Sequence, residues 1–340
     1  MGHFLVFYDV INVQRGDFLE IRHWDHREGD GPLLYKRHEW FRFQTRSCEG
    51  DEEKMSAFLT DLPRYPFLQY ALLTGLLVSV ACGIIGSYVV TKRITYLAGS
   101  IAHTVLGGLG AARYFQTAYG WEWLHPLYGA VFAALLAAVI IGLVSMGARQ
   151  REDTVIGALW AIGMAVGILF ISRTPGYNED LMGYLFGNIL MVSPGELWMI
   201  AGLDIVVVAA GTLFYNHFLA LCFDEEFARL RGVRVEIYYL GLLCLTALTV
   251  VLLVSVVGIV MVIALLTLPA AVAGELTKRL WHMMALATVL TVLFTTAGLA
   301  FSYGPDLPAG AVTVVFAGLA YLLAASGLQI IRRHGRAKQP

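Results

Sequence analysis

Long apolar runs recur along this chain, and they limit what it can fold into. A helix that crosses a bilayer needs about 20 apolar residues, because the hydrocarbon offers no water to satisfy backbone hydrogen bonds. Such runs occupy residues 67–90, 97–116, 126–146, 154–172, 195–214, 236–254, 256–274, 281–302 and 310–331. The sequence therefore predicts an all-α polytopic membrane protein with about eight or nine transmembrane helices.

Charged residues are scarce and unevenly placed. They make up 14% of the chain, against about 25% in soluble domains, and they are concentrated before residue 66. We therefore divide the chain into an N-terminal extension at 1–54, a lead-in at 55–65, a transmembrane domain at 66–331 and a basic tail at 332–340. The extension lacks a signal-peptide pattern. It is expected to be disordered, or to precede a true start of translation at Met55.

Basic residues in the loops indicate how the chain is oriented, because Lys and Arg are enriched on the cytoplasmic side of membranes. With the N-terminus outside, the inner loops and tail hold Lys92, Arg93, Arg149, Arg151, Arg229, Arg231, Arg234, Lys278, Arg279, Arg332, Arg333, Arg336 and Lys338. After residue 65, the outer ends hold only Arg113 and Arg173. The tail and the charged segment 215–236 are therefore expected in the cytoplasm. The apolar stretch 182–192 is too short to cross, and we expect it to be re-entrant or interfacial.

Segment 215–236 has the pattern of an amphipathic helix at an aqueous face. One face of this helix would carry the apolar residues Leu219, Phe223, Phe227 and Leu230. The charges change sign along the helix in an order that suits its dipole: Asp224, Glu225 and Glu226, then Arg229. The spacing allows a Glu225–Arg229 pair, and Gly232 is expected to end the helix. A solvated loop helix and a partner-binding helix both fit this pattern.

Polar residues inside spans are costly and often functional. His103 shares a helix face with Gly99, Ser100 and Gly107. Such small residues either let helices approach closely or leave a narrow polar lumen. His103 is therefore either a ligand on an ion path or a histidine hydrogen-bonded within a helix interface. A neutral imidazole suits zinc, whereas carboxylates suit manganese.

Two carboxylates are further candidates for an ion path. Asp204 lies near the middle of a span, where it could attract a cation or accept a hydrogen bond from a neighbouring helix. Asp180 lies at an outer end, where a cation would enter, and a solvated loop acid fits the same position. No G-x-x-x-x-G-K-[ST] motif occurs, so the chain does not hydrolyse ATP by that route.

Five segments together resemble the permease subunit of metal-type ABC importers, the family that brings zinc, manganese or iron(II) into bacteria. They are GSYVVTKRITYLAGSIAHTVLGG, DLMGYLFGN, FDEEFARLRGV, VVGIVMVIALLTLPAAVA and SYGPDLPAGA. They occur in the order and at the spacing of the family, over about residues 66–330.

The resemblance implies a homodimeric, multi-pass permease in the bacterial inner membrane, surrounded by lipid and with no nucleic-acid partner. The cytoplasmic helix at about 216–232 would dock into a separate ATP-binding subunit, through Phe223, Asp224, Glu225, Glu226, Arg229 and Gly232. An extracytoplasmic metal-binding protein would deliver the ion. The chain would not be an enzyme and would hold no permanent cofactor, only a transported metal, with zinc favoured over manganese or iron(II).

His103 matches the histidine of the family's second span. Many members carry an Asp four residues before it, where this chain has Gly99. That departure favours His103 alone, or with Asp204, over a paired Asp–His site.

Two alternatives to a metal permease remain open. A proton-coupled secondary carrier would show inverted repeats and more intramembrane charges. A permease for a metal chelate such as cobalamin or a siderophore would hold fewer metal ligands along its path.

Overall fold

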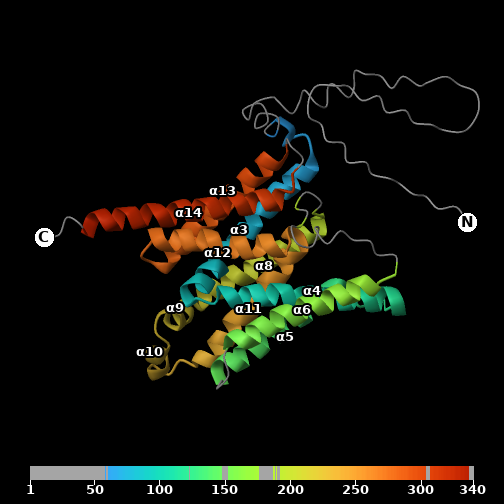
Figure 1. Ribbon diagram of the computed structural model, residues 1–340, viewed down its shortest axis with the longest axis horizontal. Coiled ribbons are helices and arrows are strands. Elements are labelled where there is room, and N and C mark those ends of the chain that lie inside the picture. The colour runs from blue at the N-terminus through green and yellow to red at the C-terminus, as the bar shows by residue number, and fades with distance from the viewer. Residues whose placement is uncertain are drawn as a thin grey trace, which may run out of the picture. The chain divides into compact units, whose positions relative to one another are not determined.

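A computed structural model describes residues 58, 60–121, 123–147, 152–175, 187, 189, 192–303 and 307–336. The N-terminal extension, Asp180 and most of the stretch 182–192 lie outside the described residues. The helices, labelled as in Figure 1, are α3 (Pro66–Lys92), α4 (Thr95–Tyr119), α5 (Pro126–Gly147), α6 (Glu152–Arg173), α8 (Pro194–Leu213), α9 (Tyr215–Phe223), α10 (Glu225–Leu230), α11 (Val235–Val257), α12 (Ile259–Leu276), α13 (Leu280–Tyr303) and α14 (Ala309–Arg336).

Each of the long apolar runs forms a helix, which confirms the predicted all-α polytopic fold. Within the described part of the chain, 8 helices are long and apolar enough to cross a membrane. Of the helices that the nine apolar runs form, the one not among them is α4, whose sequence includes His103 and Arg113. It packs against α5 and α6 and also contacts α11. Because most of α4 meets protein, its sequence needs fewer apolar residues than a lipid-facing helix.

The helices pack in two groups, and α11 contacts both. Figure 1 shows α4, α5 and α6 side by side, and the packing contacts agree. In the second group α3 packs against α8, α12 and α13, and α14 lies against α12 and α13. Large apolar side chains of α11 and α12 are fully buried where the groups meet: Leu242, Leu243, Leu253, Ile259 and Met261. The core of the described structure therefore centres on α11.

Small residues on α4 allow its close contact with α6. A Cβ atom at Gly107 would lie 2.8 Å from the carbonyl oxygen of Gly163, nearer than side-chain carbons approach. At Gly99 the added Cβ would lie 3.1 Å from the ring of Trp160. Of the two roles predicted for this small face, the structure assigns close helix packing.

Candidate functional site

The connections with many basic residues meet at one end of the bundle. Lys92, at the end of α3, forms an ion pair with Glu225 of α10. A cleft of about 390 Å³ lies between them and the facing ends of α5 and α6, lined also by Met146 and Asp153. The α13 start lies here too, since the Thr91 hydroxyl is 3.6 Å from the Met283 sulfur. The loops that the charge pattern groups together thus lie at the same end.

The predicted amphipathic helix at about 216–232 is two short helices in the structure. α9 ends at Phe223 and α10 begins at Glu225. Between them Asp224 has an extended backbone, and its carboxylate accepts a hydrogen bond of 2.9 Å from the amide of Phe227. A single continuous helix was therefore wrong. The cause is local, because an aspartate side chain competes for backbone amides and favours a helix start over a helix interior.

This break divides the predicted apolar face. Leu219 on α9 packs against the core. The side chains after it are exposed to different degrees, with Phe223 at 67%, Phe227 at 49% and Leu230 at 87% exposure. The guanidinium of Arg231 lies 4.8 Å from the centre of the Phe227 ring. Exposed large apolar residues that lie together and among charges are typical of a surface that binds another protein.

The charges of α10 pair with other elements, not with each other. Glu225 contacts Lys92, and Arg229 lies 3.0 Å from Glu236 at the start of α11. The Glu225–Arg229 pair that the spacing allows is therefore not among the described ion pairs. Each side chain has instead found an opposite charge on a neighbouring helix. Of the three acidic residues, Glu225 contacts Lys92 and Asp224 accepts the Phe227 amide, whereas Glu226 is exposed and has no described ion pair.

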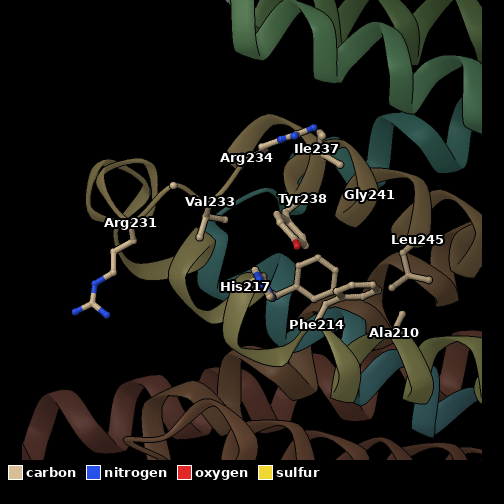
Figure 2. A pocket seen from close by; sticks show the side chains of 12 residues that line it. Ala210, Phe214, His217, Arg231, Val233, Arg234, Ile237, Tyr238, Gly241 and Leu245 are labelled. Carbon is tan, nitrogen blue, oxygen red and sulfur yellow. The ribbon is translucent and has the colours of Figure 1, made fainter.

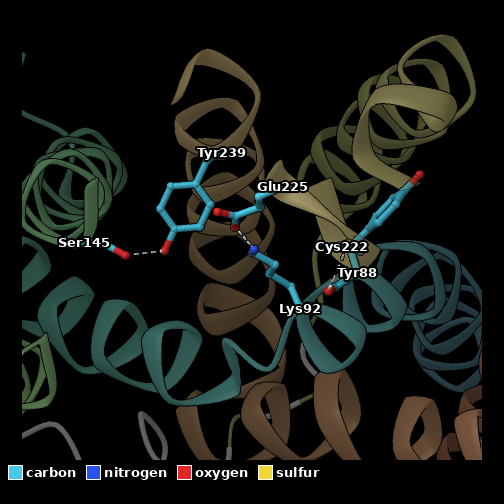
Figure 3. Close-up of polar contacts among 6 residues, drawn as sticks. All are labelled: Tyr88, Lys92, Ser145, Cys222, Glu225 and Tyr239. Atoms are coloured by element: carbon cyan, nitrogen blue, oxygen red, sulfur yellow. Dashed lines mark hydrogen bonds and ion pairs between the residues drawn. The ribbon is translucent and has the colours of Figure 1, made fainter. Parts of the chain in front are cut away.

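Figure 3 shows how Lys92 links α10 to the bundle. Its side chain extends from α3 toward Glu225, and its ammonium group lies 5.9 Å from the centre of the Tyr239 ring. The Tyr239 hydroxyl lies 3.1 Å from that of Ser145 on α5. The Lys92 side chain is only 16% exposed. The sequence indicates only that Lys92 is a basic residue near a loop, because its partner Glu225 is 133 positions away.

Gly232 ends α10 as predicted. Its φ of 78° is in the left-handed region that favours glycine. The amide of Gly232 donates to the carbonyl of Arg229 at 2.9 Å, and that of Val233 to the carbonyl of Ala228 at 3.1 Å. These two bonds form a Schellman motif, which turns the chain sharply toward α11.

His103 lies within the bundle, between α4 and α6. Its ring stacks on Trp160 with centroids 4.4 Å apart and planes inclined by 20°. The side chain is buried, and its Nδ1 has no hydrogen-bond partner among the described residues. The neighbouring hydroxyl of Ser100 donates to the carbonyl of Ile156 at 2.9 Å and not to the imidazole. The described contact that places the His103 ring is therefore its stacking on Trp160.

Asp204 faces α3 near Ala81 and Cys82. Its side chain is buried, and neither carboxylate oxygen meets the geometry of a hydrogen bond to a described residue. The structure gives Asp204 and His103 different neighbours, α3 for one and α6 for the other. In the described part of the chain, no three His, Cys, Asp or Glu side chains gather closely enough to hold a metal ion. Asp180 lies outside that part.

The relationship of this chain to known proteins follows from its match to a model of a protein family. The model described as the ABC 3 transport family matches residues 64–327. The chain belongs to the ABC 3 transport family. The match covers the whole helical domain from α3 into α14, including α9 and α10.

Relatives of this ABC 3 chain match it over most of their own length. A Chlamydia trachomatis protein named "probable metal transport system membrane protein" is 39% identical over 76% of this chain and 88% of its own length. The manganese transport system membrane protein MntC of Halalkalibacterium halodurans is 34% identical over 79% and 90%. A solved structure titled PsaBC from Streptococcus pneumoniae in complex with Fab superposes with a TM-score of 0.70, at 28% identity over 79% of this chain and 94% of that one.

Proposed function

We propose that this ABC 3 chain is the membrane permease subunit of a bacterial importer for a divalent transition-metal ion, driven by a separate ATP-binding subunit. The observation that carries the proposal is the family match over residues 64–327, with relatives of nearly full length named for metal or manganese transport. The apolar helices supply the membrane passage, and no ATP hydrolysis is assigned to this chain. We place it in the inner membrane with the C-terminus in the cytoplasm.

The proposed contact with the ATP-binding subunit is formed by α9 and α10. Phe223, Phe227 and Leu230 are exposed at the end where basic loops meet, and the charge pattern supports a cytoplasmic position for that end. Glu226 and Arg229 lie beside these apolar side chains. Glu225, although predicted as a contact residue, is held by Lys92, so we assign it to the attachment of α10.

We further propose that two copies of the chain assemble around the metal path, and that an extracytoplasmic metal-binding protein delivers the ion. His103 offers one free nitrogen, and Asp204 two carboxylate oxygens. A sparse set of ligands supports transport, because tight binding would trap the ion. Asp180 is a proposed entry residue.

Manganese and zinc are the metals to compare. The imidazole of His103 favours zinc, whereas the names of the relatives favour manganese. We propose manganese as the principal cargo. The names of the relatives support this choice more strongly than His103 supports zinc, because an importer selects its metal by more than one ligand. Unlabelled iron(II) would be tested as a competitor of manganese in the uptake assay described next.

The decisive experiment is uptake of radioactive manganese and zinc. Cells that lack their own high-affinity importers would express the permease with an ATP-binding subunit and a metal-binding protein from the same genome. We expect uptake of manganese that excess unlabelled manganese abolishes and that stops when the ATP-binding subunit is omitted. Uptake that persists without that subunit would overturn an ABC mechanism and favour a secondary carrier.

A further inference from the structure

A pocket of about 730 Å³ lies between the end of α8, the helix α9 and the start of α11 (Figure 2). This volume is in the ~300–1,000 Å³ range of small-molecule sites. Its walls are mostly apolar and aromatic, with Ala210, Phe214, Ile237 and Leu245 among the lining residues. At Gly241, which also lines it, a Cβ atom would meet nothing within 4 Å. The pocket therefore has unfilled space beside a glycine of α11.

Polarity changes along this pocket. Arg231 and Arg234 line one end, just before α11 begins. Leu245 lines the other end, eleven positions further along (245 − 234), which is roughly 16 Å at the helical rise of 1.5 Å per residue. Leu245 lies inside a helix long and apolar enough to cross the membrane. The pocket thus runs from a basic entrance at the aqueous boundary to an apolar floor within the span.

His217 lines the pocket between its two ends. Its ring stacks on Tyr238 with centroids 4.4 Å apart, and its buried Nδ1 has no hydrogen-bond partner among the described residues. In Figure 2 the imidazole lies beside Phe214 and Tyr238, while the side chains of Arg231 and Arg234 extend outward from the rim. The two long basic side chains are exposed and carry a charge at the entrance without closing it.

The distribution of these groups narrows the class of ligand. Two guanidinium groups would repel a metal cation, and one imidazole is a poor metal site. A docked protein segment would not reach the apolar floor, because that floor lies within the membrane span. A molecule with an acyl chain and an anionic headgroup matches both ends, and basic pockets between transmembrane helices on the cytoplasmic side bind such headgroups.

We propose that this pocket binds an anionic glycerophospholipid from the cytoplasmic leaflet. The acyl chain lies along Gly241 and Leu245, and the phosphate is held near Arg231 and Arg234 at the entrance. The leaflet rests on the orientation proposed above, whereas the binding itself does not. Because α9 and the turn after α10 form the walls, the lipid also steadies the surface proposed to contact the ATP-binding subunit.

Native mass spectrometry of the intact permease tests the binding. The purified chain would be equilibrated with equal amounts of phosphatidylglycerol and phosphatidylcholine of the same acyl chains, and retained lipid counted. We expect retention of phosphatidylglycerol in clear excess. Arg231→Gln with Arg234→Gln should lower that preference roughly thirty-fold, given about 1 kcal/mol for each basic residue near a membrane surface. Gly241→Leu should fill the pocket and remove the retained lipid.

Gly202→Leu is the matched control for the pocket. Gly202 lies on α8 outside the pocket, and a Cβ atom there also meets nothing within 4 Å. This variant should retain lipid like the unmodified chain. Equal retention of the two lipids, or unchanged retention in Gly241→Leu, would overturn the proposal. Full displacement of the lipid by soluble glycerol phosphate would do so as well, because a free phosphate site would then suffice. If the permease retains phosphatidylglycerol selectively but transports no metal, the lipid proposal holds and the proposed function fails.

Discussion

At the scale of single residues, one substitution can separate the observed stacking of His103 from its proposed role as a metal ligand. Its ring stacks on Trp160, and its Nδ1 is free. Phenylalanine keeps a ring for the stacking but removes the nitrogen ligands. We expect His103→Phe to reduce metal uptake by about tenfold or more, as loss of groups that tune a metal site does, while the amount of folded permease in the membrane is unchanged. The assay is uptake of radioactive manganese per amount of permease in the membrane. Normal uptake by His103→Phe together with reduced uptake by His103→Ala would mean that His103 only packs.

The carboxylate of Asp204 is the second residue with a specific expectation. Asp204→Asn keeps the shape of the side chain and removes the charge. Because neither oxygen meets hydrogen-bond geometry with a described residue and the nearest backbone donor is that of Ala81, the substitution removes at most a weak contact. The midpoint of thermal unfolding should therefore not fall, and uptake should fall less than in His103→Phe. A marked loss of stability would show that Asp204 has a hydrogen-bonded structural role. A complete loss of uptake would show that Asp204 contributes more to transport than His103.

At the scale of elements, α10 is attached to the bundle by its charges and presents its apolar side chains outward. Phe227→Asp or Leu230→Asp should weaken binding of the ATP-binding subunit by about thirty-fold, the effect of losing roughly 2 kcal/mol at an interface hot spot. Co-purification and transport-coupled ATP hydrolysis measure this effect. Leu307→Asp is the matched control, because Leu307 is exposed between α13 and α14 and lies away from α10. If the control and the α10 variants behave alike, α10 is not the contact.

The Lys92–Glu225 pair allows a charge-swap test of the attachment. Glu225→Lys places two ammonium groups together and should impair coupling and lower stability by about 1 kcal/mol. Lys92→Glu combined with Glu225→Lys restores an opposite pair and should recover much of both. ATP hydrolysis by the assembled transporter and thermal unfolding are the readouts. A double variant no better than Glu225→Lys would show that Glu225 acts on the partner subunit and not on Lys92.

At the scale of the whole molecule, the orientation in the membrane can be tested by labelling. A cysteine at Trp123 should react with a membrane-impermeant thiol reagent added to intact cells, and one at Lys278 only after the cytoplasm is opened. The labelling would use a Cys48→Ser background, which removes one native thiol. The native Cys222 thiol interferes little, because burial raises its pKa to about 12. Cys222 should therefore label slowly near neutral pH and faster as pH rises, because only the thiolate reacts. Labelling of Lys278→Cys in intact cells would invert the proposed orientation.

Local features explain why so much of the fold is predictable. The helical spans follow from apolar runs, since a backbone in hydrocarbon must satisfy its hydrogen bonds within a helix. Gly232 ends α10 because the left-handed turn there favours a residue without a side chain. The family resemblance was also readable, because its motifs are contiguous segments.

The sequence by itself determined the number and place of the apolar helices, the end of α10 and the family. Only the tertiary structure decided that α4 uses its small face to pack on α6, that Glu225 pairs with Lys92, and that His103 stacks on Trp160. Each of these depends on a partner from a distant part of the chain. A short local pattern states which contacts a side chain can make, and packing selects which of them it does make.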